Sequence, residues 1–85
     1  MRIFILDSRG EQKSIYIMES DKVADLKNET KKSFQIDNDI ELVYNGELLM
    51  DDEKTLLELG IKDGVTVNYL GKFNAGFKNI YIIKI

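Results

Sequence analysis

The chain of 85 residues contains no cysteine, no histidine and no proline. Without cysteine, disulfide bonds and thiolate chemistry are excluded. Without histidine, the chain lacks the usual general base and the commonest neutral metal ligand. The absence of proline also excludes an X-Pro isomer as a conformational switch. Two of the residue types that most often carry catalytic and metal chemistry are therefore missing.

The sequence also lacks an excess of basic residues, a long apolar run and a signal-peptide pattern. Net charge is −3, which argues against nucleic-acid binding because phosphates need a basic surface. No apolar run reaches the length of about 18 residues that a membrane span needs. The N-terminus has neither a long apolar region nor a small-residue cleavage pattern, so a signal peptide is not expected. We therefore expect one small domain with no membrane partner, located in the cytoplasm, the nucleus or both.

Candidate catalytic and binding motifs are equally sparse. The four serines, Ser8, Ser14, Ser20 and Ser33, have no evident activating partner, and no glycine-rich phosphate loop is present. The acidic run 51–53 lacks the alternating acids and the glycine of a calcium loop, so it predicts a solvated loop. The chain is not expected to be an enzyme or to hold a cofactor or metal.

Apolar patterning predicts the secondary structure. Residues 1–7 and 13–18 are β-prone runs joined by a polar turn that contains Gly10, which indicates a hairpin. Ser20-Asp21 predicts a helix N-cap. The residues that then follow at helical spacing are Val23, Leu26, Lys27, Thr30 and Phe34. Strands are expected over 40–44 and 48–49 around Asn45-Gly46, a helical turn over 56–61 ending at Gly60, and a last strand over 65–73.

These periodicities predict one core between a sheet and the helix. Its predicted members are Ile3, Ile5, Ile15, Ile17, Val23, Leu26, Leu42, Leu49, Leu56, Ile61 and Val67. Met1 is expected to point inward with them, and Phe4 outward. The fold class is therefore α+β, with a hairpin, a crossing helix and return strands on one sheet.

The run 46–69 resembles the second half of a ubiquitin-like domain. It has Gly46, a leucine three residues later, an aspartate five later, then Thr55-Leu56, Ile61 and a Lys-Asp-Gly turn before a strand. Residues 1–5 look like the first strand of the same family. The resemblance covers residues 1–73 and implies a ubiquitin-like β-grasp, a mixed sheet in the strand order 2-1-5-3-4. It also implies that Lys27 pairs with Asp51 or Asp52.

In this family the sheet face opposite the helix is the main recognition surface. The corresponding residues here are Ser8, Val43, Asn68 and Leu70, and Leu6 adds another aliphatic side chain. The resemblance implies a non-catalytic protein-interaction module, in the ubiquitin and proteasome pathway. Its expected partners are ubiquitin-binding domains, proteasome subunits or a similar receptor. Glu41 and Glu47 stand where ubiquitin has basic residues around this surface.

The segment 74–85 is expected to be a C-terminal extension of the domain. Members of the family that act as covalent modifiers end in Gly-Gly, and here the pair is Ala75-Gly76, followed by nine residues. One hypothesis is a modifier that is cut and conjugated at Gly76. The favoured hypothesis is a hairpin loop over 73–77, with an additional C-terminal strand that packs on the domain, self-associates or meets a following domain. A disordered tail, or the start of a longer protein, is the third alternative.

Overall fold

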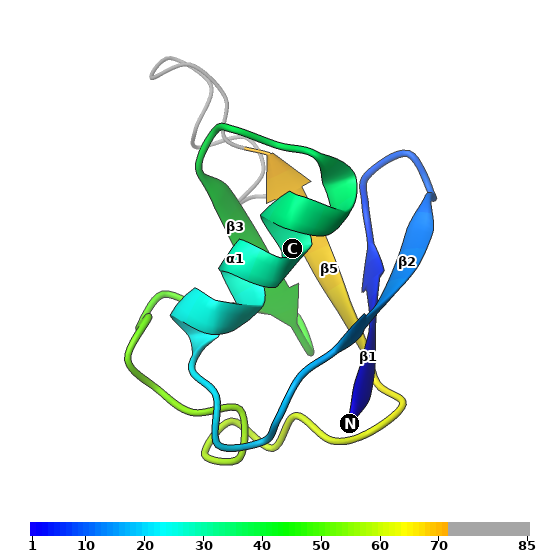
Figure 1. Cartoon of the computed structure of the whole chain (residues 1–85). Coiled ribbons are helices and arrows are strands. Elements are labelled where there is room, and N and C mark those ends of the chain that lie inside the picture. The colour runs from blue at the N-terminus through cyan, green and yellow to red at the C-terminus, as the bar shows by residue number, and fades with distance from the viewer. Residues whose placement is uncertain (72–85) are drawn as a thin grey trace.

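The computed structural model describes residues 1–71, and they form a five-stranded mixed sheet crossed by one helix (Figure 1). The elements in chain order are β1 (Arg2–Leu6), β2 (Gln12–Tyr16), α1 (Val23–Phe34), β3 (Ile40–Tyr44), β4 (Glu47–Leu48) and β5 (Thr66–Gly71). The sheet order is β2-β1-β5-β3-β4, with β1 and β5 parallel and the other pairs antiparallel. The predicted α+β β-grasp and its strand order are confirmed. The expected extension of β5 to residue 73, and the additional strand, lie outside the described residues.

Two turns follow from local sequence. Asn45 and Gly46 both have positive φ, of 54° and 79°, which is the geometry that a two-residue hairpin loop requires and that this residue pair tolerates best. Gly10 in the β1–β2 turn also has positive φ, of 90°. Both predicted hairpins are confirmed, although β4 covers 47–48 where 48–49 was expected.

The start of α1 differs from the prediction. Lys22, and not Ser20 or Asp21, occupies the N-cap position. The amide groups of Val23 and Ala24 donate to the carbonyl oxygens of Lys54 and Asp52, at 2.9 and 3.1 Å. Helix N-terminal amides need acceptors from outside the helix, and here a loop some 30 residues later along the chain supplies them. A capping rule based on neighbouring residues therefore placed the cap one or two residues too early.

All predicted core residues are buried between the sheet and α1, and Ile40 joins them. Thr30 lies in the same layer with none of its surface exposed, and its hydroxyl donates to the Leu26 carbonyl oxygen over 2.8 Å. That bond satisfies the hydroxyl within its own helix, which is why the apolar stripe tolerates a threonine. Met1 packs against the core from one side, as expected, whereas Phe4 lies on the opposite face of the sheet.

Lys27 also faces the sheet side of the helix, and the structure confirms its predicted pairing. Its ammonium lies 2.8 Å from the Asp52 carboxylate and 3.7 Å from that of Glu41. Because the Lys27 side chain is only 17% exposed, the two carboxylates compensate a charge that is costly to leave unpaired. The second partner, Glu41, was not predicted.

Residues 56–60 form hydrogen-bonded turns, where a short turn of helix was expected. The Gly60 amide donates to the Leu57 carbonyl oxygen and the Ile61 amide to that of Leu56. This pair of bonds is the Schellman pattern that ends helices, with Gly60 at φ 73°. The terminator was predicted correctly, but the helix that it would terminate is too short to be assigned. Within residues 1–71, no helix has the length and apolar character that a membrane crossing demands.

Candidate functional site

The sheet face opposite α1 carries a row of side chains that crosses four strands. Strand register places Leu6 of β1 beside Asn68 of β5, Asn68 beside Val43 of β3, and Val43 beside Leu48 of β4. Directly opposed residues in a sheet point to the same face. In Figure 1 the helix covers only the other side of the sheet. We call these four residues the sheet-face row.

Most of the predicted recognition residues lie on or beside this row. Leu70 belongs to the next rung of β5, opposite Glu41, and is partly exposed like Leu6. Asn68 is exposed, and so is Ser8, which sits in the turn that follows β1. The structure therefore brings Leu6, Asn68 and Leu70 together and leaves Ser8 at the margin.

Val43 differs from the expectation. It lies on the predicted face, but only 3% of its surface is exposed. The strands on both sides contribute neighbours to it, Leu48 from β4 and Asn68 from β5. A residue in a central strand can be enclosed by such cross-strand neighbours even on a face without a helix. Val43 therefore packs between its neighbours on this face and offers a partner little contact area.

Two residues of this face were not among the predicted site residues. Leu48 ends the sheet-face row and is partly exposed. Phe4, also partly exposed, lies opposite Thr66 one rung from Leu6, and the Arg2 guanidinium sits 4.9 Å from its ring centroid. The period-two pattern of residues 1–7 already put Phe4 outward. Leu48 could have been found by continuing the register of the Asn-Gly hairpin.

Charge on this face is acidic at the β3–β4 side. Glu41 points its carboxylate to Lys27 at the edge of the sheet and is 18% exposed. Glu47 is exposed and belongs to no ion pair among residues 1–71. Of the two acids that replace basic residues of ubiquitin, only Glu47 is thus free to meet a partner.

The turn that follows β1 is held by one buried carboxylate. Asp7 accepts hydrogen bonds from the amides of Arg9 and Glu11, at 2.9 and 2.8 Å, and its second oxygen lies 3.4 Å from the Arg9 guanidinium. Burial acts to raise the pKa of Asp7, but these hydrogen bonds outweigh it and the pKa lies below its ordinary value of 3.8. Asp7 therefore fixes the loop that carries Ser8.

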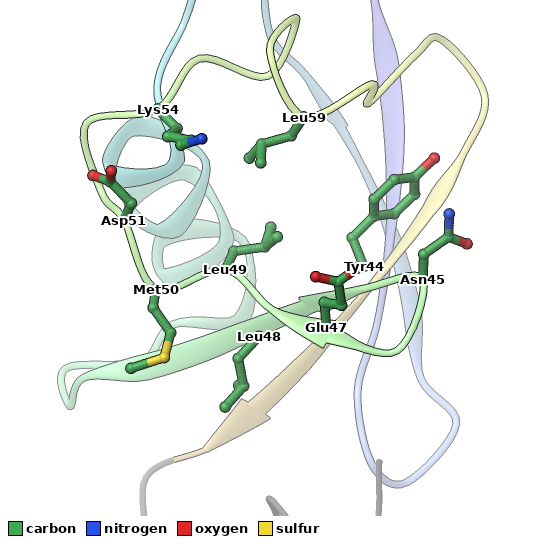
Figure 2. Close-up of a pocket in the computed structure, with 9 residues that line it drawn as sticks. All are labelled: Tyr44, Asn45, Glu47, Leu48, Leu49, Met50, Asp51, Lys54 and Leu59. Atoms are coloured by element: carbon green, nitrogen blue, oxygen red, sulfur yellow. The ribbon is translucent and has the colours of Figure 1, made fainter.

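A groove opens beside β4, between the β3–β4 hairpin and the segment that leads to Gly60. Figure 2 shows Leu49 and Leu59 pointing toward one another across it, with the Tyr44 ring on one side. Its volume is about 360 Å³. Exposed polar and charged residues form its rim: Asn45, Glu47, Asp51 and Lys54. The remaining lining residues are Leu48 and Met50, and Met50 is 76% exposed. The sequence pattern does not predict this groove, because its walls come from separate segments.

The acidic side chains of residues 51–53, beside the groove, form contacts within the domain. Asp52 binds Lys27, Glu53 binds Lys22 over 2.8 Å, and Asp51 accepts the Glu53 amide. Within the described part of the chain, no three acidic residues gather in a way that could hold a metal ion. The hypothesised conjugation residue, Gly76, lies outside the described residues.

Comparison with known proteins agrees with this geometry. No curated protein matches the chain. The model of the ubiquitin family matches residues 3–74, which spans most of the 85 residues. Domains of this family bind other proteins and are generally non-enzymatic. The matched length, together with the mixed sheet and its single crossing helix, shows that the chain belongs to the ubiquitin family.

Proposed function

We propose that the protein is a non-catalytic interaction module that binds other proteins through the sheet face opposite α1. The observation that supports this most directly is the sheet-face row, with Leu6 and Leu48 partly exposed at its two ends. Leu70 and Phe4 extend the apolar area on either side of it. Apolar area with a polar surround is the usual anatomy of a protein-binding site.

The expected partners are ubiquitin-binding domains, proteasome subunits or a similar receptor, in the cytoplasm or nucleus. Glu47 at the rim favours a partner with a basic residue at the corresponding place, because complementary charges set orientation and partner choice. Ser8 at the margin and Asn68 within the sheet-face row are exposed polar groups that supply hydrogen bonds to the partner. Val43 has a supporting role in this proposal.

A titration followed by NMR tests the proposal. Isolated ubiquitin-binding domains and a proteasomal receptor subunit are added in turn to the isotope-labelled full chain. The amide signals of Leu6, Asn68 and Leu70 should shift, and those of the helix residue Asn28 should not. Replacing both Leu6 and Leu70 with alanine should weaken binding about tenfold or more, since truncating central apolar contacts typically costs more than 1 kcal/mol.

The matched control is Leu57→Ala, which removes an aliphatic side chain that is 62% exposed and lies outside this face. The Leu57→Ala variant should bind each partner with the same affinity as the unaltered protein. Signal changes confined to α1, or an equal loss of affinity in the control and the double variant, would show that the interface lies elsewhere.

A further inference from the structure

The groove beside β4 combines an apolar floor with a rim that carries two carboxylates, Glu47 and Asp51, and one ammonium, Lys54. Leu49 and Leu59 form the floor, and the rim carboxylates of Glu47 and Asp51 take part in no ion pair of the described residues. An engineered cavity of roughly 150 Å³ admits benzene, so a groove of about 360 Å³ has room for two apolar side chains. The groove thus fits an apolar segment that also carries positive charge.

We propose that the occupant is the chain's own C-terminal segment, residues 77–85, bound within the same molecule. The apolar residues of this segment are Phe77, Ile80, Tyr81, Ile82, Ile83 and Ile85. A β-prone run of this kind is an aggregation hazard if it stays exposed. Docking two of its side chains onto Leu49 and Leu59 covers part of the run and fills the groove.

Charge complementarity supports this choice of occupant. Residues 72–85 contain three lysines, Lys72, Lys78 and Lys84, and no acidic residue. Subtracting these 3 from the 12 basic residues of the whole chain leaves 9 against 15 acidic residues, a net charge of −6 for residues 1–71. The segment is therefore basic and the domain acidic, with Glu47 and Asp51 placed at the groove itself.

The segment is also long enough. β5 ends at Gly71, opposite Ile40, and the groove begins at Tyr44, about 14 Å further along β3 at 3.4 Å per residue. β4 lies two strands from β5, about 10 Å across the sheet. The direct path is thus roughly 17 Å. Even with the expected turn over 73–77, residues 78–85 span up to about 26 Å when extended, so the apolar run can reach the groove.

A spin label tests the proposal in the full chain. Because the protein has no cysteine, Asn79→Cys provides one attachment point for a nitroxide next to the apolar run. If the segment docks, the label should broaden the methyl signals of Leu49 and Leu59 more than those of Ile36. Ile36 lines a hollow together with Tyr69 near the end of β5, so a segment that stays undocked should broaden Ile36 more than the groove. That second pattern would overturn the proposal.

Charge reversal supplies the matched comparison. Glu47→Lys with Asp51→Lys should abolish the excess broadening in the groove. Glu19→Lys with Asp37→Lys makes the same charge change at two exposed positions outside the groove and should leave it intact. Equal broadening in both double variants would refute the role of the rim. If spin-labelled protein broadens the groove signals of isotope-labelled, unmodified protein in a mixture, the occupant is a second copy and docking within one molecule is wrong.

Discussion

Replacing Leu56 with alanine should destabilise the domain far more than the same replacement at Leu57. The two residues are adjacent, and both backbone amides are used in the same way, donating over 2.9 Å to the carbonyl oxygens of Asp21 and Glu19 respectively. Their side chains differ completely, because Leu56 has no exposed surface and Leu57 is 62% exposed. The pair therefore isolates the contribution of side-chain burial from that of the backbone.

The expected magnitudes follow from this difference. Truncating a fully buried leucine costs about 2–5 kcal/mol, the sum of lost transfer free energy and the cavity left behind. Truncating an exposed leucine usually changes stability by less than about 0.5 kcal/mol. A domain of this size has a free energy of unfolding of about 4–11 kcal/mol. Leu56→Ala thus removes a large share of the total, and its Tm should fall by about 4–8 °C for each kcal/mol lost.

Urea unfolding monitored by circular dichroism measures both variants on the full chain. The midpoint should fall in Leu56→Ala with little change in the slope m, whereas Leu57→Ala should match the unaltered protein. If Leu56→Ala is too unstable to purify, Ile61→Val at another buried position should cost about 0.5–1.5 kcal/mol. A difference below about 1 kcal/mol between the two leucine variants would refute the assignment of Leu56 to the core.

Two other predictions concern acid stability and the C-terminus. The lowered pKa of Asp7 means that its carboxylate stabilises the fold above its ordinary pKa of 3.8, and that this stabilisation is lost as pH falls through the lower folded-state value. Asp7→Asn should therefore be less stable than the unaltered protein at pH 7, and urea titrations should show the gap closing below about pH 4; a gap independent of pH would contradict this. For Gly76, we expect a turn and no conjugation, so a 1–76 chain incubated with a ubiquitin-type activating enzyme and ATP should form no adduct. An adduct that a chain lacking Gly76 does not form would establish the modifier hypothesis.

Local patterns predicted the parts of the fold that local interactions determine. The Asn45-Gly46 hairpin depends on the positive φ of two adjacent residues, and the burial of Ile3 and Ile5 depends on the alternation of one strand. At the N-terminus of α1, the amides of Val23 and Ala24 bond to the distant carbonyl groups of Lys54 and Asp52, and only the bond from the Lys22 amide to the Asp25 carboxylate is local. Val43 was placed on the correct face, but its burial depends on β4 and β5 lying on both sides.

The same distinction applies to the candidate site. Family resemblance indicated the face that carries Leu6, Asn68 and Leu70, because strand register is shared across a fold. It did not indicate the groove, because its floor joins Leu49, next to β4, to Leu59 in the later turn segment, and its size depends on how these segments pack. A hollow that forms between separate segments can be located only once the three-dimensional structure is known. The two faces of a strand, in contrast, can be predicted from the alternation of its residues.

The two proposals share two residues, Leu48 and Glu47, and can otherwise fail separately. Leu48 ends the sheet-face row and also lines the groove. A C-terminal segment in the groove would therefore lie at the edge of the partner-binding face without covering Leu6 or Leu70, which belong to β1 and β5. Alanine at Leu6 and Leu70 tests the face without altering the groove. Lysine at Glu47 and Asp51 tests the groove without removing apolar area from the face. Because Glu47 also faces the partner in the proposed function, the readout for this variant is the broadening of the Leu49 and Leu59 signals and not partner affinity.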